Sequence, residues 1–376
     1  MKSARLGDVA LIQRQSVDPS KIDPNTIYIG LEHLERGGRI IGHDTVGNAE
    51  LASSKFIFSA RHLLYSKLRP NLGKISRPNF SGVCSTDILP VLPGSQLNRD
   101  YLAHYLAQPS MVNFASSRAA GANLPRLSPA TLDEFEIPLP PLEEQRRIAA
   151  ILDHTDALRA KRRQVLTHLD SLAHALFNEA LKASTACDTA LGDVARFAGG
   201  ASLPPGEPFA GQPGGTLLMK VSDMNSSGNE RTILKTALWT DRAVPASSTV
   251  EAGAVVLPKR GASIATNKKR VVTRRTTLDP NLMGVTPIND RLTSDYIFAW
   301  LNAFDLASIT SGSSVPQLNK QDLAPLLFPL PSRADQLQFS ARIGPVELAR
   351  TRSQLSLAIA DKLFASLQKR AFRGEI

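Results

Sequence analysis

The spacing of apolar residues divides the chain into two kinds of segment that alternate. Short apolar runs bounded by Gly, Pro, Asn and Ser predict buried strands, as at 27–29, 56–58, 88–91 and 254–257. After Pro141 neither proline nor glycine occurs until Gly192, and the composition shifts to Ala, Leu, Arg, Gln and Glu. The first pattern is typical of a compact α+β domain, and the second predicts a long helix.

The predicted helix after Pro141 carries a narrow apolar stripe. Two glutamates in its first turn, Glu143 and Glu144, suit the positive end of a helix dipole. The stripe residues, at spacings of three, four or seven, are Ile148, Ile151, Leu158, Val165, Leu169, Leu172 and Leu176. About 40 helical residues would extend ~60 Å, more than one domain core can cover. A helix of this kind needs a partner helix.

A second stripe near the end of the chain supplies this partner. Its residues are Ile343, Val346, Leu348, Leu355, Ile359, Leu363 and Leu367. Pro345 lies inside this stretch, and we expect it to kink or restart the helix because proline cannot donate the backbone hydrogen bond. The two helices are separated by a whole domain, so the chain can return antiparallel to the first helix.

The alternation reflects an internal repeat, which is best sought before the fold is interpreted. The run Leu-Gly-Asp-Val-Ala occurs at 6–10 and again at 191–195. Further matches follow in the same order, pairing 64–67 with 256–259, 100–102 with 295–297, 121–127 with 312–318, and 138–140 with 329–331. We therefore predict two similar α+β globular domains separated by two long antiparallel coiled-coil helices, related by an internal pseudo-twofold axis.

The predicted domain organisation has four parts. A first globular domain covers 1–141 and a long helix covers 142–183; a second globular domain covers 184–332 and a second helix covers 333–376. An antiparallel helix pair would turn the two domains by about 180° relative to each other. Facing one duplex, such heads would read two short half-sites with an unread gap, as symmetric repressors do.

Charge favours a polyanionic partner. The 376 residues hold 44 Lys and Arg against 34 Asp and Glu, a net charge of +10. In each half the cations gather in a stretch without acids, between Glu50 and Asp87 and between Glu251 and Asp279. Contact with DNA phosphates explains this matched distribution better than a solvated basic surface does. Two cysteines, no signal-peptide pattern and no membrane-length apolar run predict a cytoplasmic protein without membrane contact.

Candidate DNA contacts follow from the matched segments. Cations expected to contact phosphate are Lys67, Arg69, Lys74, Lys259, Arg260, Lys268, Lys269 and Arg270. Any of the arginines could instead form a bidentate contact with guanine. Asn123, Arg126 and Gln317 carry amide or guanidinium groups suited to base edges. The alternatives are ordinary surface lysines and loops that only pack each domain onto its helix.

No enzyme motif accompanies these residues. The sequence lacks a nucleophile elbow, a phosphate-binding loop, zinc-ligand spacing and the element with which amino-methyltransferases hold a flipped base. The nearest approach to that element, 279–282, lacks its second proline and its aromatic residue. Asp8 and Asp193 are interpreted as turn residues before strands. A self-contained modification enzyme and a coiled-coil scaffold that binds RNA or lipid remain alternative hypotheses.

Taken together, the motifs resemble the specificity subunit of type I restriction–modification systems. The resemblance rests on 138–148 (PLPPLEEQRRI), on 65–70 (YSKLRP), on the Leu-Gly-Asp-Val starts and on the ending 368–376. It implies that each globular part is a target-recognition domain reading half of a split DNA site. The helices would set the spacing and dock two methyltransferase subunits.

The resemblance also places the chemistry outside this chain. Restriction/translocase subunits would join the assembly, and S-adenosylmethionine and ATP would bind partner subunits, with no cofactor in this chain. The second copy departs from the family pattern, since 331–336 reads PSRADQ where the first copy has PPLEEQ.

Overall fold

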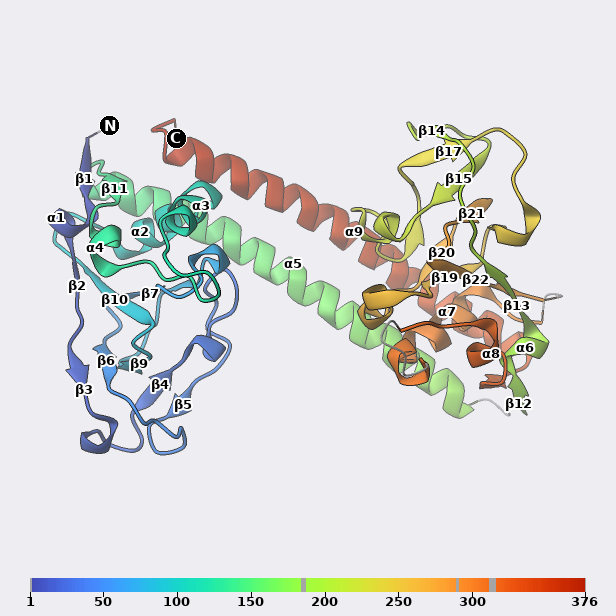
Figure 1. The fold of residues 1–376 in the computed structure, drawn as a ribbon, viewed down its shortest axis with the longest axis horizontal. Coiled ribbons are helices and arrows are strands. Elements are labelled where there is room, and N and C mark those ends of the chain that lie inside the picture. Colours follow the sequence, from blue (N-terminus) through green and yellow to red (C-terminus); the bar gives the residue numbers. More distant parts are fainter. Residues whose placement is uncertain (1, 184–186, 289–290, 311–315, 376) are drawn as a thin grey trace. The chain divides into compact units, whose positions relative to one another are not determined.

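The computed structural model describes residues 2–183, 187–288, 291–310 and 316–375. The chain forms two compact units, the first made of 1–160 and 359–376 and the second of 161–358. Each unit combines a globular part of helices and strands with segments of two long helices (Figure 1). The repeat segment 312–315 and the predicted boundary at 184 lie outside the described residues.

The globular part of the first unit is built on two sheets. The four-stranded sheet has the order β2 (Ala10–Ile12), β10 (Ile88–Pro93), β7 (Leu63–Ser66), β8 (Ile75–Ser76). The five-stranded sheet has the order β3 (Ser16–Val17), β6 (Lys55–Phe58), β9 (Gly82–Cys84), β4 (Ile27–Ile29), β5 (Asp44–Thr45). A two-stranded ribbon joins β1 (Ser3–Arg5) to β11 (Glu136–Pro138), and the helices are α1 (Leu6–Val9), α2 (Arg99–Leu106), α3 (Pro109–Ser117) and α4 (Pro129–Asp133).

The second unit repeats this plan. Its first sheet has the order β13 (Ala195–Gly199), β22 (Leu282–Pro287), β19 (Val255–Pro258), β20 (Arg270–Val272), β16 (Thr232–Ile233). Its second sheet has the order β14 (Glu207–Pro208), β17 (Leu238–Thr240), β15 (Thr216–Met219), β21 (Thr276–Leu278), β18 (Thr249–Val250). The ribbon is β12 (Cys187–Ala190) with β23 (Leu327–Leu330), and the helices are α6 (Leu191–Val194), α7 (Ser294–Ala303) and α8 (Lys320–Leu323).

The four strands predicted from apolar runs are confirmed as β4, β6, β10 and β19. They form because their side chains are buried: β19 and the first four residues of β10 are buried throughout. The matched repeat segments 100–102 and 295–297 both lie in helices, α2 and α7. The predicted α+β class follows from these elements.

Matched hydrogen bonds confirm the internal repeat at atomic detail. The buried amide of Gln145 accepts a hydrogen bond from the Asn98 N–H (2.8 Å) and donates to the carbonyls of 96 and 140. Gln336 does the same in the second unit, accepting from the Thr293 N–H (2.8 Å) and donating to the carbonyls of 291 and 331. Each glutamine thereby fixes the start of a long helix against its own globular part.

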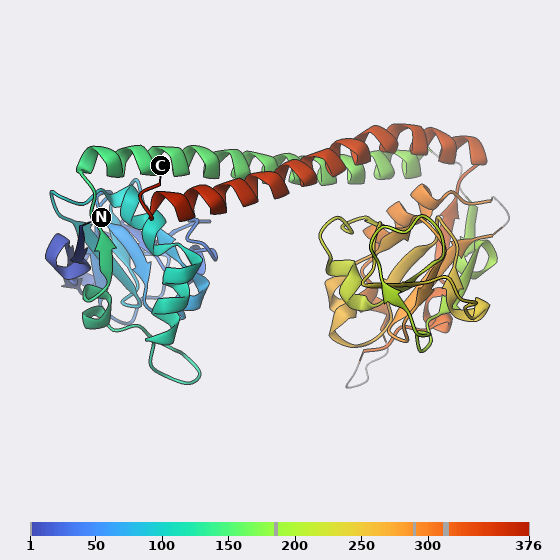
Figure 2. The ribbon, with the colours of Figure 1, turned by 90° about the horizontal axis from the view of Figure 1, so that it is seen from above.

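The long helices are α5 (Leu142–Ala183) and α9 (Arg333–Ala371). Both contribute residues to both units, and within each unit their segments lie side by side (Figure 2). In the second unit Asp170 pairs with Arg350 (2.9 Å) and Glu179 pairs with Arg342 (2.7 Å). The positions ascend along α5 while they descend along α9, so the segments are antiparallel, as predicted.

Two expectations about these helices hold only in part. The helix does not restart at Pro345, since α9 is continuous through it, with Ile343 and Val346 buried on either side. The predicted apolar stripes are only partly buried: Leu158 is 45% exposed and Leu355 is 61% exposed. The reason is that the globular parts select which helix face is covered.

Aromatic side chains form the contacts between each globular part and the long-helix segments of its unit. In the first unit Tyr101 packs on Phe372 of the chain end that follows α9, with ring centroids 5.2 Å apart. In the second unit Tyr296 contacts Phe177 of α5 (5.4 Å) and Phe339 of α9 (5.7 Å). These bulky rings bury more apolar surface than an aliphatic stripe would. No described helix combines the length and apolarity needed to span a membrane.

Candidate nucleic-acid interface

Two loops that are distant in the sequence meet at the end of β7 in the first unit. The Arg69 N–H donates to the Pro125 carbonyl (2.8 Å), and the Leu127 N–H donates to the Lys67 carbonyl (2.9 Å). Arg69 itself adopts a left-handed backbone conformation, with φ of 50°. These contacts bring together the basic segment and the Asn-Leu-Pro-Arg segment that the sequence singled out independently. We call 67–69 with 125–127 the first paired loops.

The second unit builds the same arrangement at the end of β19. The Gly261 N–H donates to the Pro316 carbonyl (2.8 Å), and the Leu318 N–H donates to the Lys259 carbonyl (2.9 Å). We call 259–261 with 316–318 the second paired loops. The residues just before β10 and β22 also match. The Lys67 N–H donates to the carbonyl of Asp87, and the Lys259 N–H donates to the carbonyl of Asn281. The sequence repeat therefore yields equivalent backbone positions in the two units.

In the first paired loops one carboxylate serves two cations. Arg126 donates from Nε to Asp87 Oδ1 (3.0 Å) and from Nη2 to Asp87 Oδ2 (3.2 Å). The Lys67 ammonium lies 3.7 Å from the same carboxylate. Hydrogen bonding to Asp87 and its charge raise the pKa of Arg126. Arg69 and Asn123 are exposed.

The second paired loops carry less compensating charge. Asn281 stands where the first unit has Asp87, so the equivalent carboxylate is missing. Among the described residues no acid pairs with Lys259 or Arg260, and Arg260 is exposed. Gln317 donates from Nε2 to Asn319 Oδ1 (2.9 Å). The backbone positions are thus alike while the side-chain chemistry differs.

Two predicted phosphate contacts have buried head groups. Lys269 is 1% exposed, and its ammonium donates to Asn267 Oδ1 and to the Phe304 carbonyl, each at 2.7 Å. This burial lowers the pKa of Lys269 to about 8. Arg270 is also buried and donates to the carbonyls of Lys269 (2.8 Å) and Met224 (3.0 Å). Both side chains hold the backbone of the second unit, so neither head group is available to DNA as the chain stands.

The remaining predicted cations are tied to nearby groups. Lys74 donates to the Leu31 carbonyl (2.8 Å), and Lys268 donates to Asn225 Oδ1. Charge alone in the sequence gives no warning of such roles. For Arg270 a signal exists, because it opens the alternating pattern of β20 in which every second residue faces inward.

Arginine clamps between each globular part and its helices were not predicted. In the first unit Arg77 reaches Asp100 of α2 (3.3 Å) and Asp153 of α5 (2.7 Å). His104 Nε2 lies 2.8 Å from the same Asp153 oxygen. Burial alone would raise the pKa of Asp153, but the hydrogen bonds from His104 and Arg77 hold it well below its usual range.

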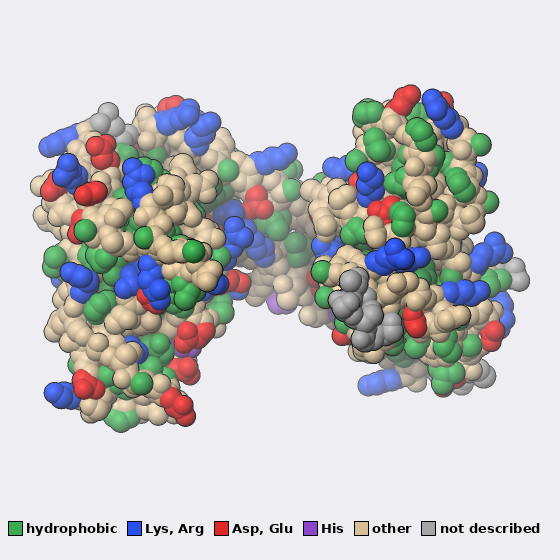
Figure 3. Space-filling model, in the orientation of Figure 1, with side chains coloured by type: hydrophobic (Ala, Val, Ile, Leu, Met, Phe, Trp, Pro, Cys, Tyr) green, Lys and Arg blue, Asp and Glu red, His purple; other side chains and the backbone are tan. Residues whose placement is uncertain are grey.

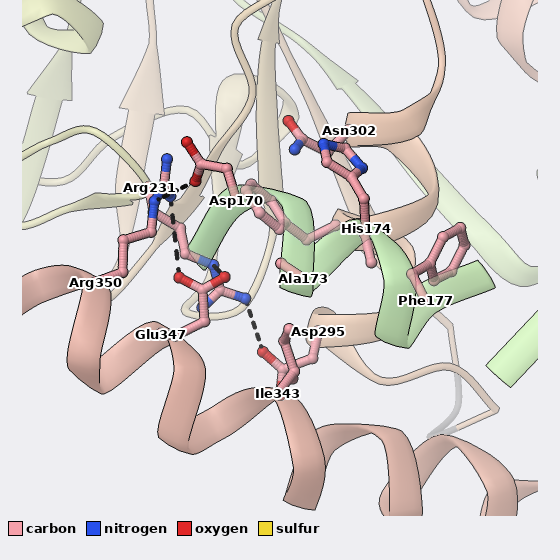
Figure 4. Close-up of a pocket in the computed structure, with 12 residues that line it drawn as sticks. Asp170, Ala173, His174, Phe177, Arg231, Asp295, Asn302, Ile343, Glu347 and Arg350 are labelled. Atoms are coloured by element: carbon pink, nitrogen blue, oxygen red, sulfur yellow. Dashed lines mark hydrogen bonds and ion pairs between the residues drawn. The ribbon is translucent and has the colours of Figure 1, made fainter. Parts of the chain in front are cut away.

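The second unit has a matching clamp centred on Arg231 (Figure 4). Arg231 reaches Asp295 of α7 (3.1 Å) and Glu347 of α9 (3.3 Å), and its guanidinium lies over the Phe298 ring. Arg350 adds a contact to Glu347 at 3.9 Å. These groups line a cavity of about 170 Å³. Burial raises the pKa of Glu347, against the opposing charges of the two arginines.

The exposed charge is spread over the visible surface. In Figure 3 basic side chains form small groups among acidic ones on both units. The described residues contain no group of three or more side chains able to hold a metal ion. The arrangement common to both units is the paired loops, in which a guanidinium group (Arg126) and an amide group (Gln317) lie at equivalent backbone positions near cations.

Comparison with known proteins gives the class. Residues 1–168 match the family described as type I restriction modification DNA specificity domain. The specificity subunit of the Escherichia coli type I restriction enzyme EcoDI is 26% identical over 187 residues, covering 48% of this chain and 41% of that protein. The EcoKI specificity subunit of E. coli K12 is 34% identical over 159 residues, covering 41% and 32%. The matched region thus spans less than half the length of these relatives.

Solved structures extend the likeness in fold to the whole chain. The type I restriction–modification S subunit of M. genitalium has 15% identity and a TM-score of 0.63, covering 99% of this chain and 96% of that one. A chain from a study of type I complex assembly and conformational transition has 18% identity and a TM-score of 0.52, covering 100% and 98%. Residues 1–168 are thus similar to the type I restriction–modification DNA specificity domain, and the fold of the whole chain is similar to that of type I specificity subunits.

Proposed function

We propose that the chain is the DNA-binding specificity subunit of a type I restriction–modification complex, with each globular part reading one half of a bipartite site. The observation that carries this proposal is the pair of equivalent paired loops, one in each unit. A duplicated binding element is what a split site requires, because each half-site needs its own set of contacts. The similarity of residues 1–168 to the type I DNA specificity domain supports the same conclusion.

The cations of the paired loops would supply phosphate contacts. Lys67 and Lys259 lie at matched positions and are partly buried, and the exposed Arg69 and Arg260 belong to the same loops. Each phosphate contact releases counterions and positions a head on the duplex without reading sequence. We exclude Lys269 and Arg270 from this set because their head groups are buried. Asn123 stays in it as an exposed candidate for a base edge.

The long helices would act as the spacer and as the docking surface for two methyltransferase subunits. Apolar side chains that the helix pair leaves exposed support docking, among them Leu348, Leu355, Ile359 and Leu363, all more than half exposed. Methyl transfer with S-adenosylmethionine and ATP-driven cleavage would belong to methyltransferase and restriction/translocase partners. The four-part division into 1–141, 142–183, 184–332 and 333–376 expresses this proposal.

Mapping the methylated positions in DNA from cells that carry the complete system tests the proposal. The expected result is a bipartite sequence with a tolerant gap, lost when this chain is deleted. Purified chain alone should neither methylate nor cleave DNA. Activity of the isolated chain would favour the self-contained enzyme, and preference for RNA or lipid over duplex DNA would favour the scaffold.

The spacer role has a separate test. The variant carries four extra residues in each long helix, after Arg162 in α5 and after Ala358 in α9. Both insertion points lie eight residues from the Asp170–Arg350 pair, so the antiparallel register of the helices is kept. The insertion adds ~6 Å of helix, which is one to two base pairs at ~3.4 Å each. We expect a longer gap with both half-sites unchanged. A change in the half-site sequences would contradict the spacer role.

A further inference from the structure

We propose that Arg126 and Gln317 are specificity-determining residues at equivalent positions, Arg126 reading a guanine in one half-site and Gln317 reading an adenine in the other. The proposal rests on the proposed function and assigns a base to each unit. It is carried by how the two side chains are held and by which of their hydrogen-bonding groups remain free.

The two residues occupy the same place in the repeat. Arg126 forms a β-bridge with Leu68, the residue after Lys67, and Gln317 forms one with Arg260, the residue after Lys259. Both bridges are antiparallel and lie between the paired loops. A difference in side chain at this position therefore changes the recognition chemistry while the backbone stays the same.

Asp87 holds the Arg126 guanidinium from one side only. The carboxylate occupies Nε–H and one Nη2–H, which leaves both Nη1 hydrogens and the outer Nη2 hydrogen free. These free donors form the end-on fork that matches O6 and N7 of guanine in the major groove. Free arginine loses much rotamer freedom when it binds, and a fork already held in place loses less.

The same carboxylate argues against a phosphate role for Arg126. Asp87 neutralises one positive charge within hydrogen-bond distance, and Lys67 shares it. A phosphate contact depends on net charge, whereas a base contact depends on the direction of donors. Pairing with Asp87 reduces the net charge at Arg126 but leaves N–H donors that point in fixed directions. This combination suits a contact with a base edge better than one with a phosphate.

Gln317 is held in a complementary manner. Its Nε2 donates one hydrogen to Asn319 Oδ1, so within the described part of the chain one N–H and the Oε1 acceptor have no partner. This donor–acceptor pair is what adenine requires, since its N7 accepts and its N6 donates in the major groove. Gln317 is half-buried, which limits the directions from which a base edge can approach.

Substitution to alanine tests each assignment in the assembled complex. The readout is the methylation pattern of random-sequence duplexes treated with this chain and the methyltransferase subunits of its own system. Arg126→Ala should relax guanine preference at one position of one half-site by about 5- to 150-fold. Gln317→Ala should relax adenine preference by a similar factor in the other half-site. A uniform loss of affinity with every base preference intact would overturn the assignment.

A swap of the two chemistries is the sharper test. Asn281→Asp with Gln317→Arg places the Asp–Arg pair of the first unit in the second unit. We expect the adenine at that position to become guanine, with the other half-site and the gap unchanged. The control Arg126→Lys keeps the charge and removes the fork, so it should behave like Arg126→Ala in base preference.

The outcomes separate this inference from the proposed function. If the wild-type complex methylates a bipartite site that lacks a guanine in one half or an adenine in the other, this inference fails alone. If the wild-type complex shows no bipartite site, the proposed function fails. Thermal unfolding of each variant checks folding, and should the swap variant fail to fold, the two alanine variants still decide the assignment.

Discussion

Replacing Arg231 by methionine should destabilise the second unit far more than a surface charge substitution. Arg231 bridges Asp295 and Glu347, and its side chain is 17% exposed. Methionine fills similar space but leaves the Glu347 carboxylate, itself 15% exposed, without its nearest cation. Arg350 remains at 3.9 Å and compensates only in part.

The magnitude follows from the burial of each partner. Breaking a fully buried ion pair costs ~3–5 kcal/mol, but Asp295 is 40% exposed and contributes ~1 kcal/mol or less. Loss of the cation–π contact with Phe298 adds ~0.5–2 kcal/mol. With partial compensation by Arg350, we expect the free energy of unfolding to fall by ~2–4 kcal/mol.

Tryptophan fluorescence during urea unfolding measures this loss in the correct unit. The chain has two tryptophans, Trp239 and Trp300, and both lie in the second unit. With a urea dependence of ~2–3 kcal/mol/M for a unit of this size, the midpoint should fall by about 1 M.

A matched control and a rescue make the result interpretable. Arg275→Met breaks the exposed Arg275–Glu251 pair in the same unit and should cost under ~1 kcal/mol. Adding Glu347→Gln to Arg231→Met should recover part of the loss, because the unpaired buried charge is then removed. Equal destabilisation by Arg231→Met and Arg275→Met would refute the clamp as a source of stability.

Three further predictions concern buried or partly buried polar groups. Gln145→Leu should lower the free energy of unfolding of the first unit by ~2–4 kcal/mol, because it leaves the partly buried Asn98 N–H without its acceptor and two carbonyls without their donor. The exposed Gln164→Leu should change it little, and circular dichroism during thermal unfolding compares the two variants. The pKa of Lys269 falls to about 8 in the folded chain, so above that pH the unfolded chain binds more protons and the free energy of unfolding should rise between about pH 8 and 10.5. Lys269→Met should abolish this rise in urea titrations followed by tryptophan fluorescence. The pKa of Asp153 lies below its usual range, so the stabilisation it provides is present above about pH 4 and is lost as the pH falls. Asp153→Asn should be less stable than wild type at pH 7 but should lose less stability between pH 5 and 3. The same loss of stability over that range in variant and wild type would contradict this.

Much of the architecture could be predicted because it depends on local sequence patterns. The absence of proline and glycine after Pro141 and the acids in the first turn specify a helix whatever it packs against, and α5 begins at Leu142 and ends at Ala183. The repeated Gly-containing and Pro-Leu-Pro segments identify equivalent positions because duplicated sequences fold alike. Short apolar runs bounded by turn residues likewise specify β4 and β19.

The candidate site was predicted at the level of segments and less well for individual residues. Both basic segments and both base-edge loops were identified, and the structure shows that they pair. Which cations remain exposed depends on the local fold: Arg69 lies on a loop, whereas Arg270 opens a strand and points inward. A count of charges contains no information on burial.

The sequence by itself determined the repeat, the long helices and the segments that form the paired loops, because these depend on composition and spacing along the chain. Only the tertiary structure decided the burial of Lys269, the Arg126–Asp87 pair and the clamps of Arg77 and Arg231. The physical reason is that most of these contacts join groups far apart in the sequence, from Arg77 with Asp100 to Arg231 with Glu347, and side-chain partners at such distances follow from packing.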